Sequence, residues 1–172
     1  MKQIFKKYNK NIQRKNFYPF ICILSLLLLS GCGITSIPVK LESTTHIIEK
    51  NQEKEELFIS ANIWLVESFK SAKDVIQFSD KEAGIVMGKY MLQPPYYIGD
   101  SSNPNPNGVT ALIKIQTKDG ATRITVVPEA FREFESAMRP DLSYTREIAQ
   151  QQINRLIQSY TSFVRYDQSN DW

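Results

Sequence analysis

Cysteine and histidine are scarce in this sequence, with two cysteines and one histidine among 172 residues. A zinc or iron–sulfur site built from protein side chains needs more ligands than these. Two cysteines also exclude a fold held together by several disulfides. The sequence contains no Gly-x-Ser-x-Gly elbow and no phosphate-binding glycine-rich loop. We therefore expect no metal, no cofactor and no catalytic residues, and hence no enzyme.

The first 31 residues have the pattern of a secretory leader. Six basic and no acidic residues precede position 17, and residues 17–29 are uncharged and mostly apolar. As a helix, this apolar stretch would be about 20 Å long. A helix that crosses a membrane needs roughly 20 residues, or about 30 Å. A basic stretch followed by a short apolar stretch is typical of a signal peptide. Residues 1–31 are therefore predicted to be removed.

The leader ends in Leu29-Ser30-Gly31-Cys32, which resembles the lipobox of bacterial lipoproteins. The resemblance implies cleavage before Cys32 and attachment of a diacylglyceryl group to its thiol. Two or three acyl chains anchor a protein durably, because each buried methylene contributes about 0.8 kcal/mol. Gly33, in place of Asp after the cysteine, favours the outer membrane by the same resemblance. We expect residues 32–36 to form a lipidated tether in the bacterial cell envelope, with the domain facing the periplasm.

Loss of the leader reverses the net charge. The whole chain has 21 Lys and Arg against 18 Asp and Glu, a net charge of +3. The leader carries six basic and no acidic residues, so the remaining chain has 15 basic against 18 acidic residues, a net charge of −3. A net-negative body lacks the basic surface of a nucleic-acid binder, so no nucleic-acid partner is expected.

Residues 37–172 are predicted to form a single domain that begins with a strand and a helix. Alternation predicts a strand over 39–47, and its proposed inner side is made of Val39, Leu41, Ser43, Thr45 and Ile47. A helix is expected from about Gln52 to Ser71, with Asn51 as its N-cap. Trp64 and Phe69 are expected to lie in the core.

The rest of the domain is predicted to consist of strands and a final helix. Strands are expected over 74–78, 85–92, 109–117 and 121–127, and Asp119-Gly120 joins the last two as a strong hairpin signal. Phe131, Phe134 and Met138 predict a short helical turn. The stripe of the helix after Pro140-Asp141 consists of Ala149, Ile153, Leu156, Ile157, Tyr160 and Val164. The order β-α-β-β-β-β-α predicts an α+β fold, an antiparallel five-stranded sheet with two helices on one face.

Three blocks of this domain resemble a known family. They are Trp64-x-x-x-x-Phe69-x-Ser71-Ala72-Lys73-Asp74-Val75-Ile76-Gln77-Phe78, Asp80-Lys81-Glu82-Ala83-Gly84-Ile85-Val86-x-Gly88-Lys89 and Lys118-Asp119-Gly120-Ala121-x-Arg123. They are similar to an uncharacterised bacterial family described as a domain of unknown function with a TBP-like fold. The resemblance implies the order β-α-β₄-α and supplies no catalytic residues. Likeness to a DNA-bending fold does not imply DNA binding.

Candidate binding residues are few. His46 is expected on the solvent side of an edge strand, without a second ligand nearby. The cluster of Lys73, Asp74, Asp80, Lys81 and Glu82 suits a solvated turn, although paired carboxylates can also act as acid and base. The loop over 93–108 carries Tyr96 and Tyr97 after two prolines, and its Asn-Pro run has few ways to bury itself. These tyrosines are either a partner-binding surface or a cover for the sheet edge.

Two main functional hypotheses follow. The first is a lipid-anchored, non-enzymatic envelope protein that binds another protein or a cell-wall component through its exposed sheet face or through Tyr96 and Tyr97. The alternative is a small envelope hydrolase that uses carboxylates and tyrosines in a cleft. A third possibility is a purely structural or stress-induced lipoprotein without a saturable partner.

Overall fold

The computed structural model describes residues 36–69, 76–95, 105, 107–135, 140 and 143–166. The chain divides into two compact units, residues 1–33 and 34–172, and every described residue belongs to the second. Within the described ranges, no helix is both long enough and apolar enough to span a bilayer.

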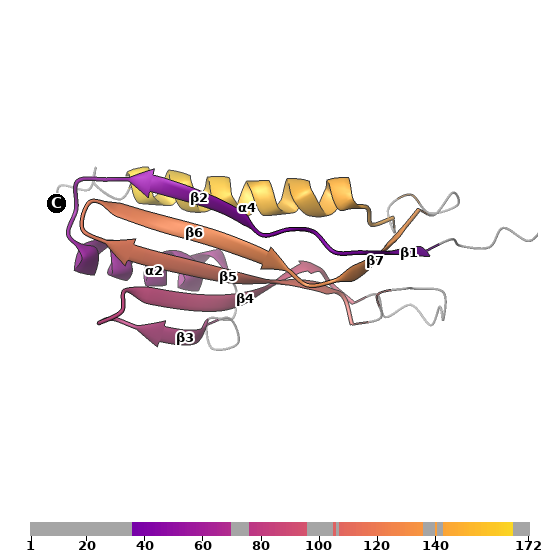
Figure 1. Cartoon of the computed structure of the whole chain (residues 1–172), viewed down its shortest axis with the longest axis horizontal. Coiled ribbons are helices and arrows are strands. Elements are labelled where there is room, and N and C mark those ends of the chain that lie inside the picture. Colours follow the sequence, from indigo (N-terminus) through magenta and orange to yellow (C-terminus); the bar gives the residue numbers. More distant parts are fainter. Residues whose placement is uncertain are drawn as a thin grey trace, which may run out of the picture. The chain divides into compact units, whose positions relative to one another are not determined.

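Seven strands in the described residues form two antiparallel sheets (Figure 1). The strands are β1 (Ser36–Val39), β2 (Thr44–Glu49), β3 (Ile76–Asp80), β4 (Ile85–Gln93), β5 (Val109–Lys118), β6 (Ala121–Pro128) and β7 (Phe131–Phe134). The main sheet has the order β2-β6-β5-β4-β3, and β1 pairs with β7 in a separate two-stranded sheet. The helices are α2 (Lys54–Ser68) and α4 (Arg146–Tyr166). The predicted α+β fold with five antiparallel strands and two helices is confirmed.

Both helices pack on the same face of the main sheet, which we call the covered face. Its strand residues are Val86, Ile113, Ile115, Ile124 and Val126, all buried in one core with side chains of α2 and α4. Trp64 lies at the centre, with its ring 5.6 Å from that of Phe69 and 5.0 Å from that of Tyr160. The expected core positions of Trp64 and Phe69 are confirmed, as is the complete buried stripe of the last helix.

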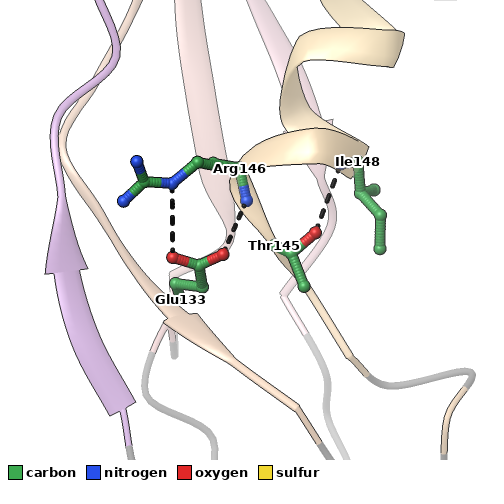
Figure 2. Close-up of polar contacts among 4 residues, drawn as sticks. All are labelled: Glu133, Thr145, Arg146 and Ile148. Atoms are coloured by element: carbon green, nitrogen blue, oxygen red, sulfur yellow. Dashed lines mark hydrogen bonds and ion pairs between the residues drawn. The ribbon is translucent and has the colours of Figure 1, made fainter.

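The start of α4 is held by two side chains (Figure 2). The Thr145 hydroxyl accepts a hydrogen bond from the backbone N–H of Ile148 at 3.4 Å. Glu133, from β7, accepts one from the backbone N–H of Arg146 at 3.1 Å and lies 3.6 Å from the Arg146 guanidinium. A carboxylate there also suits the positive end of the helix dipole. These contacts attach the helix to the small sheet.

The start of α2 is capped from a distant hairpin. Asn51 is not the N-cap, as the sequence predicted, because the helix begins at Lys54, and Glu53, which precedes it, makes no side-chain cap. Instead, the Asp119 carboxylate accepts the backbone N–H of Lys54 at 2.8 Å. The predicted hairpin is confirmed, since Lys118 pairs with Ala121 and Gly120 has a φ of +79°. The hairpin therefore both turns the chain and holds α2 in place.

The predicted first strand is wrong in its extent and in its buried side. It is divided into β1 and β2 by four residues, Lys40–Ser43, and β1 joins the other sheet. In β2, Ile48 is 2% exposed, whereas Ile47 is 59% exposed. Val39 and Ile48 are an odd number of positions apart, so in one continuous strand they would point to opposite faces. The break between β1 and β2 allows both side chains to be buried.

The predicted helical turn after the last strand is also wrong. Phe131 and Phe134 are buried ends of β7, which pairs with β1 from Val39↔Phe131 to Ser36↔Phe134. A spacing of three residues fits a helix, but the partner strand β1 supplies backbone hydrogen bonds that the local pattern does not reveal. Met138 lies outside the described residues.

Candidate functional site

The residues predicted to act directly, Cys32, Tyr96 and Tyr97, lie outside the described residues. One end of the tyrosine loop is described at Asn105, which is 7% exposed. Its side-chain amide donates to the Arg132 carbonyl at 2.7 Å and accepts the Arg132 N–H at 2.8 Å. The expectation that the Asn-Pro run has few ways to bury itself is therefore wrong at Asn105, which forms a strand-like pair of bonds with β7.

The predicted charge cluster is a structural turn in its described part. The Asp80 carboxylate accepts the backbone N–H of Ala83 at 2.9 Å, which closes the β3–β4 turn. Lys81 forms an ion pair with Glu55 of α2, and both side chains are more than half exposed. Exposed pairs of this kind contribute little to stability. Lys73 and Asp74 lie outside the described residues.

The face of the main sheet opposite the helices carries apolar side chains. We define the open-face patch as Phe78, Met87, Met91, Leu112 and Val127, from β3, β4, β5 and β6. The strand register places Val127 beside Leu112, and Phe78 beside Met87. Met87 and Met91 are diagonal neighbours of Leu112, within reach of long side chains. In Figure 1 both helices lie to the other side of these strands.

Polar groups lie both inside and around the open-face patch: Lys89 pairs with Leu112 and lies between Met87 and Met91 along β4, and Lys114 pairs with Met87. The Lys89 ammonium lies 2.9 Å from one carboxylate oxygen of Glu129, and the hydroxyl of Thr110 donates to the other oxygen. The Thr110 hydroxyl and, second to it, Lys89 hold the pKa of Glu129 below its usual value. At the opposite end, Arg123 donates to the Gln116 side chain at 2.8 Å. Exposed apolar side chains gathered on one face are a feature of protein-binding surfaces.

A hollow of about 530 Å³ lies between β2 and α4. Its lining includes Thr44–His46 of β2 and, from α4, Asn154, Gln158 and Arg165. The volume falls within the usual range for ligand pockets, roughly 300–1,000 Å³. Among the described residues, no Asp or Glu lines it. His46 is exposed on an edge strand, as predicted, but the predicted solvent side is wrong, because His46 pairs with the buried Ile124 and therefore lies on the helix side of the sheet.

Sequence reasoning expected an exposed sheet face but did not identify the apolar residues on it, because consecutive apolar residues hide which of them is exposed. Val126 is fully buried whereas Val127 is 40% exposed, and Ile47 and Ile48 differ in the same way. Pairs of consecutive apolar residues in a strand could have indicated an apolar open face, since neighbouring strand residues must point to opposite faces. On α2, Ile59, Ile63 and Val66 form a further exposed apolar row.

An α+β domain with one open sheet face is thus the class of protein that the fold defines. The model of a family described as "Domain of unknown function (DUF4468) with TBP-like fold" matches residues 44–127. This match, which runs from the start of β2 to the last residue but one of β6, supports the family resemblance. The family description assigns no activity.

Solved structures are similar at low sequence identity. A DUF4468 family protein from Bacteroides ovatus is 12% identical, with 77% of this chain and 86% of that chain covered and a TM-score of 0.43. A TBP-like protein from Parabacteroides distasonis is 12% identical, with 79% and 96% covered and a TM-score of 0.47. The protein Ara h 8.0201 is 12% identical, with 75% and 99% covered and a TM-score of 0.41. No curated protein matches the chain in sequence.

Proposed function

We propose that this chain is a lipid-anchored protein of the bacterial envelope that binds a protein partner through the open-face patch. Acyl chains on Cys32 hold it to the outer membrane, with the domain facing the periplasm. The module is non-enzymatic, and its partners are the membrane and a second envelope component. The proposal rests on one observation above all, which is that four adjacent strands expose apolar side chains on the face opposite the helices, interspersed with the lysines Lys89 and Lys114.

The composition of the patch supports a protein as the partner rather than a cell-wall glycan. Met91 is 45% exposed and Phe78 is also exposed. Methionine and aromatic side chains are enriched at protein interfaces, and methionine adapts readily to different partner surfaces. Tyr96 and Tyr97 follow β4 closely in the sequence, and we propose them as a second contact of the same partner.

Photo-crosslinking in intact cells tests the binding surface. A photoreactive residue replaces Val127 in the patch, and in a matched control it replaces Gln151, an exposed position of α4. The proposal predicts one discrete crosslinked band from position 127 that Met91→Asp abolishes. A band of equal strength from position 151, or none from position 127, contradicts it.

Acyl labelling tests the anchor independently of the partner. We expect Cys32→Ser to abolish incorporation of a palmitate analogue and to leave the precursor uncut. Cys22→Ser is the matched control, because this cysteine belongs to the predicted leader, and it should label like the wild type. Labelling that persists in Cys32→Ser contradicts the anchor.

The hydrolase alternative has no observation in its favour among the described residues. It requires carboxylates that converge in a cleft, and no carboxylate of a described residue lines the hollow between β2 and α4. The Glu129 carboxylate is already engaged by Thr110 and Lys89.

A further inference from the structure

The two edges of the main sheet are built differently. β3 spans five residues, and its pairing with β4 shifts register between Ile76 and Phe78. Such an irregularity, like a short strand, discourages the addition of another strand. β2 pairs with β6 without a shift over all six residues, and it contains no proline or lysine. β2 therefore lacks the usual protection of an edge.

The hydrogen-bonding phase of β2 shows which groups face outward. The backbone N–H of Lys50, directly after β2, donates to the Gly120 carbonyl at 3.0 Å. Bonded positions alternate in an antiparallel pair, so Ile48, His46 and Thr44 bond to β6. The N–H and C=O groups of Thr45, Ile47 and Glu49 consequently point away from the sheet. No strand in the described part of the chain pairs with them.

The flank of α4 forms a wall beside this edge. Asn154, Gln158, Thr161 and Arg165 follow the helical spacing of three and four residues, and all line the hollow together with Thr44–His46. Among the described residues that line the hollow, the charged or titratable side chains are His46 and Arg165, and both are basic. The Lys50 ammonium also lies at this end, where it donates to the Val164 carbonyl of α4.

We propose that the β2 edge and the α4 flank form a binding site for an extended, acidic segment of a protein partner, which adds to the sheet as a sixth strand. Backbone hydrogen bonds to Thr45, Ile47 and Glu49 hold the segment. Its acidic side chains alternate toward the hollow and Arg165, while the intervening apolar side chains lie beside Ile47. The site needs neither the lipid nor the open-face patch.

Peptide binding to the full-length lipidated chain in a neutral detergent tests the site. The probe is a capped peptide of about eight alternating Val and Glu residues, a typical strand length. A Val–Lys peptide tests the charge, and a Val–Glu peptide methylated on alternate amide nitrogens tests the backbone bonds. We expect binding of the first peptide only, and Arg165→Glu should reverse the charge preference. Equal binding of the methylated peptide, or no binding of any peptide, overturns the proposal.

The edge itself is tested with Ile47→Pro. Proline is tolerated at an edge strand where its missing N–H would face solvent, so this variant should fold, which circular dichroism can verify. Its affinity for the Val–Glu peptide should fall about tenfold or more, whereas Ile47→Thr, which keeps the N–H, should lose less than about threefold. Equal affinities of the two variants overturn strand addition.

Hydrogen exchange distinguishes the peptide site from self-association. Without peptide, the amides of Thr45 and Ile47 should exchange quickly and those of His46 and Ile48 slowly, at every protein concentration. The Val–Glu peptide should slow the exchange of the Thr45 and Ile47 amides. Protection of Thr45 and Ile47 that rises with protein concentration identifies a second copy as the occupant, and protection at all concentrations shows that the edge is already covered. Either result overturns the proposal.

Discussion

The two faces of the main sheet use similar residues for opposite purposes. The covered face buries Val126 and Ile48 against the helices, and the open face exposes their sequence neighbours Val127 and Ile47. Burial of an apolar side chain stabilises the fold, whereas exposure of one contributes nothing to it. An apolar residue in a strand can therefore belong either to the core or to an exposed surface. Which of the two it belongs to depends on whether it lies on the face that the helices cover.

The largest effect is expected at the centre of the covered face. Trp64→Ala removes a buried ring that contacts Phe69 and Tyr160, and we expect it to lower the free energy of unfolding by about 3–5 kcal/mol. Urea denaturation measures this loss. A loss below about 1 kcal/mol would show that the covered face does not dominate stability.

Val126 and Val127 give the most direct comparison of the two faces. Val126→Ala should cost about 2 kcal/mol, because it leaves a cavity under the helices. Val127→Ala should change the free energy of unfolding by less than about 0.5 kcal/mol. The same denaturation experiment compares both variants, and equal losses would remove the distinction between the faces.

A buried hydroxyl pair on the covered face should make stability sensitive to alkali. Tyr160 Oη lies 2.7 Å from Thr122 Oγ1, and Tyr160→Phe should cost about 1 kcal/mol near pH 7. Burial raises the pKa of Tyr160 above its usual 10.0, against a smaller opposite effect of Thr122. The unfolded chain therefore loses this proton first, so the contribution is complete below about pH 10 and declines above it.

Tyr160→Phe should accordingly lose less stability than the wild type between about pH 8 and pH 10.5. Urea denaturation at both values is the measurement. Burial also raises the pKa of Tyr144, so part of the alkaline loss should remain in the variant. An identical loss in both proteins contradicts the role of Tyr160.

A modest effect is expected where the hairpin caps α2. Asp119→Ala removes the acceptor of the Lys54 N–H and should cost about 1 kcal/mol, whereas Asp119→Asn keeps an acceptor and should cost less. Thermal unfolding of the two variants makes the comparison. If both behave like the wild type, the helix is held on the covered face by packing alone.

Much of this fold follows from local sequence patterns. The stripe of α4 and the hairpin at Asp119-Gly120 were predicted because periodicity and turn chemistry are local. The break between β1 and β2 and the strand at Phe131–Phe134 were not, because both depend on the pairing of segments about 95 residues apart. The capping of α2 by Asp119 could not be predicted for the same reason, because Asp119 and Lys54 are far apart in the sequence.

The candidate surfaces were predictable only in outline. Two helices on one side imply an open sheet face, and this much was expected from the sequence. Which apolar residues occupy it depends on the strand phase. The predicted phase of β2 placed Ile47 on the inner side of the strand, whereas Ile47 lies on the open face and Ile48 is buried. The hollow joins residues more than 100 positions apart, so no local pattern indicates it.

Methionine oxidation in isolated envelopes tests the central claim, a protein partner on the open face, most directly. Met91 is 45% exposed, and an additional methionine introduced by Gln151→Met on α4 serves as an internal reference. The account predicts that peroxide oxidises Met91 about fivefold or more slowly in envelopes than in the purified lipidated chain, while the reference is unchanged. Equal oxidation rates of Met91 in the two preparations would contradict it.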